Sequence, residues 1–94
     1  MLKVNEYFDG QVKSLALNNA EGQLTVGVME AGNYEFGTSQ QEEMTVVTGA
    51  LEIQLPGETA FTTYTKGESF KLPAGIKFQA RVNEQSAYLC RYFD

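Results

Sequence analysis

The sequence predicts an all-β fold, built as one small antiparallel β-barrel. Apolar and polar residues alternate with period two in short runs along most of the chain. Turn-forming residues interrupt these runs about every 8–12 residues, which is typical of β-sandwiches and barrels. Almost no segment has the apolar spacing of an amphipathic helix. The 94 residues suffice for a single domain, which we expect to span residues 1–94.

Each predicted strand is a short apolar or alternating run that ends at a turn signal. In chain order these strands cover residues 12–17, 24–28, 34–38, 44–48, 51–55, 61–65, 70–72, 76–82 and 87–93. Alternation is clearest where Leu51, Ile53 and Leu55 share one face. The intervening turn stretches, rich in Gly, Pro, Asn and other polar residues, are 18–22, 30–33, 49, 56–57, 66–68, 73–75 and 83–86.

The charge pattern argues against several classes of partner. The net charge is −5, and the seven Lys and Arg residues are scattered, so no nucleic-acid partner is expected, although one or two of them could hold a phosphate ion. No run approaches the roughly 20 apolar residues of a membrane helix, so no membrane partner is expected. The first ten residues do not resemble a signal peptide, and the lone Cys90 cannot form an internal disulfide. We therefore expect a cytoplasmic protein.

Two motifs narrow the barrel to a cupin. Residues 67–78 read GESFKLPAGIKF, in which Gly67 ends one strand and Pro73 with Gly75 turns the chain into the next. This spacing resembles the second cupin motif at every position but one. Where a metal-binding cupin carries a histidine, this chain carries Phe78.

The first cupin motif has a counterpart earlier in the chain. Gly32 opens a strand, and Glu42 precedes Gly49 at the distance of the acidic ligand and closing glycine of that motif. Thr38 and Gln40 fall where the paired histidines of a cupin stand, with a shorter gap to Glu42 than usual. Together the two motifs predict a cupin barrel of the RmlC-like jelly-roll type.

The missing histidines bear on mechanism. Transition metals are held by His, Cys and carboxylates at fixed geometry. The chain has no His and one Cys, so Glu42 beside neutral Thr38 and Gln40 would bind iron, manganese or zinc poorly. We expect no metal and no organic cofactor, and dioxygenase chemistry is disfavoured. An acid–base step near pH 7 falls to carboxylates, Tyr, Lys or the substrate itself.

Longer stretches resemble one family of small bacterial cupins. They are residues 32–56, residues 67–78, the opening MLKVNEYFDG and the ending SAYLCRYF, and the most specific strings are EEMTV and YLCRY. They are similar to the pyrimidine/purine nucleoside phosphorylase family over essentially the whole chain. The resemblance implies cleavage of purine and pyrimidine nucleosides by inorganic phosphate, giving free base and pentose 1-phosphate, and a homodimer.

Candidate catalytic residues follow from that chemistry. Phosphate favours the planar fork of Arg, which makes Arg91 the first candidate; Lys77 and Arg81 are weaker, since their parity opposite to Phe78 points them outward. A carboxylate suits the pentose hydroxyls and the positive charge that develops on the sugar, which selects Glu42 or Glu43. Alternation lets only one of these two face inward, and the spacing to Gly49 favours Glu42.

The substrate-binding candidates are mainly aromatic. Acceptance of many bases implies few directional contacts to the base, and stacking walls meet that need. Tyr34 and Phe78 are expected to form such a wall, with Phe36 and Tyr64 as further candidates. Thr38 and Gln40 are placed in the pocket by the motif. Tyr92 is a candidate hydrogen-bonding group, but it and Arg91 cannot both face the pocket without a bulge.

A second class of function stays open from the sequence. A non-catalytic cupin that binds a sugar or a small anion needs the same polar pocket, and a sugar isomerase is a third possibility. Incubation with uridine or adenosine, with and without phosphate, separates them: only a phosphorylase releases free base in phosphate alone.

Overall fold

The computed structural model describes residues 1–93; Asp94, the last residue of the predicted domain, lies outside the described residues. Within this range the chain forms only strands and turns, so the all-β prediction is confirmed. The strands are β1 (Lys3–Tyr7), β2 (Val12–Asn19), β3 (Gly22–Met29), β4 (Gly32–Gly37), β5 (Gln41–Thr48), β6 (Ala50–Gln54), β7 (Thr62–Thr65), β8 (Ser69–Leu72), β9 (Lys77–Val82) and β10 (Ser86–Phe93). Residues 1–93 contain no helix that could cross a membrane.

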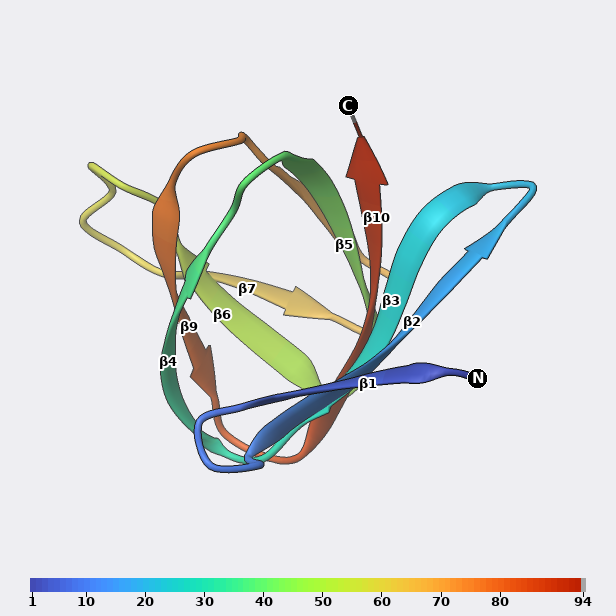
Figure 1. Cartoon of the computed structure of the whole chain (residues 1–94). Coiled ribbons are helices and arrows are strands. Elements are labelled where there is room, and N and C mark those ends of the chain that lie inside the picture. Colours follow the sequence, from blue (N-terminus) through green and yellow to red (C-terminus); the bar gives the residue numbers. More distant parts are fainter. Residues whose placement is uncertain (94) are drawn as a thin grey trace.

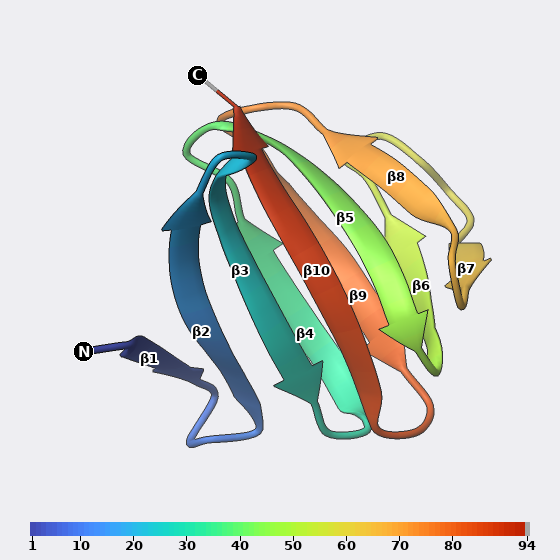
Figure 2. The same cartoon turned by 90° about the vertical axis from the view of Figure 1, so that its right-hand side faces the viewer.

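The strands form two antiparallel sheets that face each other (Figures 1 and 2). A six-stranded sheet has the order β1-β2-β3-β10-β5-β8, and a four-stranded sheet has the order β4-β9-β6-β7. The last strand, β10, lies between β3 and β5, with Tyr92 opposite Glu42 and Cys90 opposite Met44. This pairing brings the YLCRY sequence against the EEMTV sequence, although the two are far apart in the chain.

The core lies between the two sheets, where the inward side chains of both meet. Leu51 and Ile53 on β6 are buried, as is Leu72 on β8, in agreement with the predicted alternation. Phe78 on β9 also points inward and is only 3% exposed. All nine predicted strands are present, with ends shifted by a few residues.

Strand β1 was not predicted, because it has no buried face. Its residues are exposed or half-buried throughout, so the apolar alternation that marks other strands is missing. Strand β1 pairs only with β2 and forms one edge of the six-stranded sheet. The loop that follows it nevertheless reaches the cavity described below.

Gly49 closes the first cupin motif for a steric reason. It has φ +83° between β5 and β6, and a Cβ there would lie 2.1 Å from the Ser86 hydroxyl oxygen. The Ser86 hydroxyl occupies this space and accepts a hydrogen bond from the Ala50 N–H at 3.1 Å. A side chain at position 49 would break the turn that starts β6.

Candidate active site

A cavity of about 370 Å³ lies between the two sheets. This volume falls in the range of small-molecule sites. The strands of both sheets and the loop between β1 and β2 line it. The lining residues are Tyr7, Phe8, Ser14, Met29, Glu35, Phe36, Gly37, Glu42, Met44, Leu51, Ile53, Phe78, Ala80, Tyr88, Cys90 and Tyr92.

Glu42 is the half-buried carboxyl group of this cavity. It lies on β5 and faces inward, as alternation and the spacing to Gly49 predicted. One carboxylate oxygen accepts a hydrogen bond from the Cys90 thiol at 3.4 Å. Burial raises the pKa of Glu42 above its ordinary value, because a low-dielectric surrounding disfavours the charged form. Glu42 therefore holds a proton more readily than a surface glutamate does.

Next to Glu42, the inward face of β10 adds a thiol and a phenol. The hydroxyl groups of Tyr92 and Thr25 lie 3.0 Å apart. Burial, with Glu42 nearby, raises the pKa of Cys90 to about 12, so this residue is a neutral thiol at physiological pH. Burial also raises the pKa of Tyr92, so the phenol keeps its proton. The group supplies hydrogen-bond donors around one carboxyl and no nucleophilic thiolate.

Tyr88 is a cavity residue that the sequence reasoning missed. It lies opposite Gly27 on β3, and a Cβ on Gly27 would come within 2.4 Å of the Tyr88 ring. The missing side chain lets the phenol lie against the sheet and so leaves the cavity open. The alternation of side chains along β10 could have revealed it, because Tyr88 lies two and four residues before Cys90 and Tyr92 and therefore shares their inward face.

An aromatic wall faces these polar groups from the four-stranded sheet. The rings of Phe36 and Phe78 line the cavity with centroids 5.7 Å apart. Tyr34 lies behind this wall: it is buried outside the lining, and its hydroxyl donates to the Glu30 carbonyl at 2.7 Å. Tyr64 stacks on Phe70 and is likewise outside the lining.

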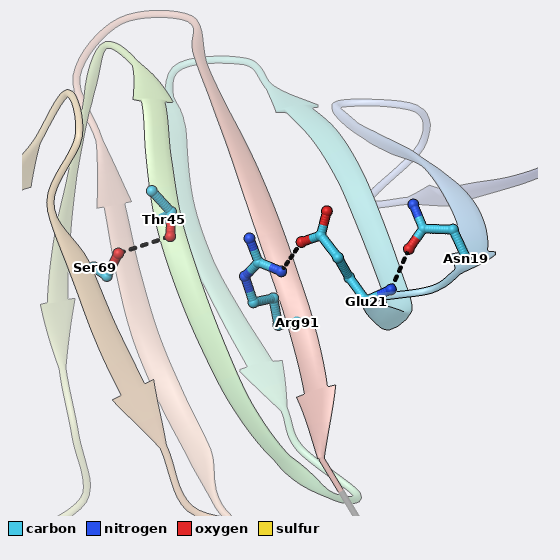
Figure 3. A network of polar contacts seen from close by, with 5 residues as sticks. All are labelled: Asn19, Glu21, Thr45, Ser69 and Arg91. Carbon is cyan, nitrogen blue, oxygen red and sulfur yellow. Dashed lines mark hydrogen bonds and ion pairs between the residues drawn. The ribbon is translucent and has the colours of Figure 1, made fainter.

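Arg91 lies on the opposite side of the sheet from the cavity. Figure 3 shows its guanidinium beside the Glu21 carboxylate in the turn between β2 and β3, an ion pair on the outer face. Alternation is the reason, since Cys90 and Tyr92 point inward and the residue between them must point outward. This placement runs against the prediction that Arg91 holds phosphate inside the cavity.

Glu43 lies on the same outer face as Arg91. In the strand register it lies opposite Arg91 of β10 and opposite Lys71 of β8. Its side chain therefore points to the other side of the sheet from that of Glu42. Figure 3 also shows Thr45, two residues further along β5, bonded to Ser69 on that outer face at 2.7 Å. The structure thus brings only one of the two candidate carboxylates to the cavity.

The other candidate cations also point away from the cavity. Lys77 is exposed, and Arg81 forms an ion pair with Glu52 and lies over the Phe61 ring, 4.1 Å from its centroid. Among residues 1–93, no Lys or Arg belongs to the cavity lining. A phosphate ion inside would meet hydroxyl, thiol and carboxyl groups from this chain.

The residues at the metal-ligand positions of a cupin do not fit a metal here. The Thr38 hydroxyl donates to the Pro73 carbonyl at 2.7 Å and accepts from the Ile76 N–H at 3.1 Å, so it fastens the second-motif turn. Gln40 lies in a separate hollow and donates to the Phe93 carbonyl at 3.2 Å. Phe78 has no donor atom. In the described part of the chain, no three His, Cys, Asp or Glu residues come together as a ligand set.

The chain is similar to solved structures with this architecture. A protein of unknown function from Vibrio parahaemolyticus superposes with a TM-score of 0.95 at 46% identity, covering 99% of each chain. An RmlC-like cupin from Shewanella frigidimarina superposes with a TM-score of 0.73 at 17% identity, covering 95% of this chain and 80% of the other. The fold is therefore that of the cupins.

Sequence comparisons point to one family. A relative from Pseudomonas syringae pv. tomato named pyrimidine/purine nucleoside phosphorylase is 55% identical over 92 residues, covering 98% of this chain and 99% of its own. A relative of the same name from Rhodopirellula baltica is 55% identical over 91 residues, covering 97% and 99%. The family model described as pyrimidine/purine nucleoside phosphorylase matches residues 2–92. The chain therefore belongs to the pyrimidine/purine nucleoside phosphorylase family.

Proposed function

We propose that this protein is a nucleoside phosphorylase that transfers the pentosyl group of purine and pyrimidine nucleosides to inorganic phosphate. The observation that carries the proposal is near-full-length identity of 55% to relatives named for this activity. The cavity supports it, because its aromatic wall and its single half-buried carboxyl group suit a base and a sugar, respectively.

Glu42 acts on the bond between sugar and base. In its protonated form it donates a proton to the base nitrogen as the C1′–N bond breaks and the electron pair goes to the base. The carboxylate left behind then faces the positively charged, oxocarbenium-like sugar and stabilises it. A phosphate oxygen bonds to C1′, and the proton released from phosphate returns to Glu42. The net products are the neutral free base, which carries the proton on the nitrogen that held the sugar, and pentose 1-phosphate.

Phosphate binds without a cation from the cavity lining. The hydroxyl groups of Tyr88, Tyr92 and Ser14 lie in the lining and donate hydrogen bonds to its oxygens. The proton on Glu42 avoids a second negative charge beside the anion, and the anion in turn favours that protonated form. Any positive charge beside the phosphate would have to come from a basic side chain of a second copy of the chain.

The reaction needs no metal and no organic cofactor; inorganic phosphate is the co-substrate. The donor atoms at the cupin ligand positions are absent or engaged elsewhere. Activity is expected to survive prolonged dialysis against EDTA. Loss of activity that manganese or zinc restores would overturn this part of the proposal.

A homodimer in the cytoplasm, each copy a single cupin barrel, completes the proposal. Apolar side chains lie on the outer face of the six-stranded sheet, where Val26 and Val28 are 43% and 54% exposed and Leu15 stands beside Val26. The ion pairs Lys13–Glu6 and Arg91–Glu21 border this face. A surface with both charges at its borders suits a second copy of itself.

The dimer has its own test. Light scattering should give twice the mass of one chain, and Val26→Glu on the outer face should give one chain mass with an unchanged fold. A wild-type protein with the mass of one chain would overturn the dimer and leave the enzymatic proposal standing.

The activity test uses uridine and adenosine with and without phosphate, with free base as the readout. Base release in phosphate only is expected. Release without phosphate would indicate a hydrolase, and no release from any nucleoside would favour a non-catalytic cupin that binds a sugar or a small anion.

A further inference from the structure

The loop between β1 and β2 has an unusual backbone. Phe8 and Asp9 have φ values of +54° and +56°, and Gly10 follows with φ +84°. A bulky residue such as Phe rarely adopts this left-handed conformation, because its Cβ crowds the backbone. The turn is held by hydrogen bonds from the Gly10 N–H to the Tyr7 carbonyl and from the Gln11 N–H to the Phe8 carbonyl, both 3.1 Å. Strain of this kind gathers at ligand clamps and active sites.

The strained turn carries the Phe8 ring across the gap between the two sheets. Its centroid lies 5.0 Å from that of Tyr34 and 5.5 Å from that of Phe36, with an edge-on contact to Phe36. Both partners belong to β4 of the opposite sheet, and Figure 1 shows the β1–β2 turn reaching toward that strand. Phe8 thus connects two sheet edges that no strand pair joins within residues 1–93.

Phe8 differs from Phe78 of the wall in its exposed surface. It lines the cavity and is still 43% exposed, whereas Phe78 is 3% exposed and is packed into the core. The Phe8 ring packs against Tyr34 and Phe36 and is exposed elsewhere, so it lies at the boundary between the cavity and solvent. A flat ligand entering the cavity would meet this ring with little change in the core.

We infer that Phe8 is the stacking surface for the nucleobase, held over the cavity mouth by the strained turn. This inference rests on the proposed function and adds the base-binding side chain to it. Every purine and pyrimidine has a π-face, so an aromatic platform binds them without directional hydrogen bonds. Phe8 therefore accounts for acceptance of both classes of base, and the larger face of a purine gains more from it.

The test compares Phe8→Ala with Phe8→Trp and with the matched control Phe93→Ala. Phe93 is 42% exposed and lies outside the lining, so it controls for the loss of an exposed Phe. Calorimetric affinity for adenosine and uridine without phosphate is measured beside KM and kcat with phosphate. Phe8→Ala should weaken nucleoside binding by roughly 5- to 150-fold, more for adenosine, with most of the loss in KM. Phe8→Trp keeps an aromatic face and should lose much less affinity than Phe8→Ala, whereas Phe93→Ala should bind as the wild type does.

A second variant guards against misfolding. Phe8→Gly adopts the left-handed φ without strain, so it keeps the turn and removes the ring. Wild-type affinity and KM in a folded Phe8→Ala or Phe8→Gly, while the wild type releases base in phosphate, would overturn this inference alone. A wild type that neither binds nor cleaves a nucleoside would overturn the proposed function and this inference with it.

Discussion

The two faces of β10 carry different groups. Tyr88, Cys90 and Tyr92 point into the molecule, where thiol and phenol groups surround the Glu42 carboxyl. Leu89, with its neighbours on β2 and β3, points out onto an apolar surface. Buried polar groups and exposed apolar groups each need an explanation, and our proposal assigns a nucleoside to the first and a second copy of the chain to the second. Alternation along one strand therefore separates the cavity lining from the exposed apolar face.

The largest expected effect comes from the pair of glutamates that the sheet divides. Glu42→Gln removes both the proton donor to the leaving base and the carboxylate that stabilises the sugar cation, so kcat should fall by roughly 10²- to 10⁴-fold for both adenosine and uridine. Glu43→Gln on the outer face is the matched control and should change kcat by less than about twofold. Equal losses in both variants would contradict the assignment to the inner face.

The packing of Tyr88 on Gly27 gives the next effect. Gly27→Ala should force the ring off the sheet and into the cavity, lowering the free energy of unfolding by about 1–3 kcal/mol and raising nucleoside KM about tenfold. Gly37→Ala is the control, since its Cβ would meet only the Ile76 carbonyl at 3.8 Å and Gly37 also lines the cavity. Chemical unfolding and steady-state kinetics are the measurements. Gly27→Ala combined with Tyr88→Leu should recover stability, and failure to do so would contradict the steric explanation.

Stability should depend on pH through the inner carboxyl. Burial raises the pKa of Glu42 above its ordinary value of 4.5, so the folded state binds the proton more tightly than the unfolded state. The free energy of unfolding contributed by Glu42 therefore falls as pH rises from the unfolded pKa through the higher, folded one. The free energy of unfolding of wild type and Glu42→Gln is measured in urea. The value of the variant should rise relative to that of the wild type between pH 4 and pH 8. The same difference at both pH values would mean that the carboxyl is not perturbed.

Arg91→Ala should have the smallest effect. Its guanidinium is paired with Glu21 on the outer face, and such partly exposed ion pairs stabilise a fold by less than about 1 kcal/mol. Phosphate KM should stay within about twofold of the wild type, measured by base release at varied phosphate. A tenfold rise in phosphate KM would show that Arg91 reaches the anion, for example in the site of a second copy.

The features that could be predicted from the sequence are those that depend on side-chain alternation and on turn-forming residues. The nine strands, the inward position of Phe78 and the choice of Glu42 over Glu43 all depend on a side-chain period of two. The same period places Arg91 on the outer face when Tyr92 points inward, whereas the candidacy of Arg91 for phosphate rested on the preference of phosphate for arginine and not on alternation. Phe8 was missed for another reason: an edge strand has no buried face, and a left-handed phenylalanine cannot be recognised from residue type.

Labelling of the Cys90 thiol offers a way to measure whether a ligand occupies the cavity. It is the single thiol of the chain, it is 2% exposed, and burial raises its pKa to about 12. Alkylating reagents attack thiolates, so labelling in the native state must wait for local opening of the sheet. A nucleoside held beside Glu42 would slow that opening further, because it binds only the closed form. Pulse labelling followed by intact-mass measurement would then report occupancy for ligands that are not turned over.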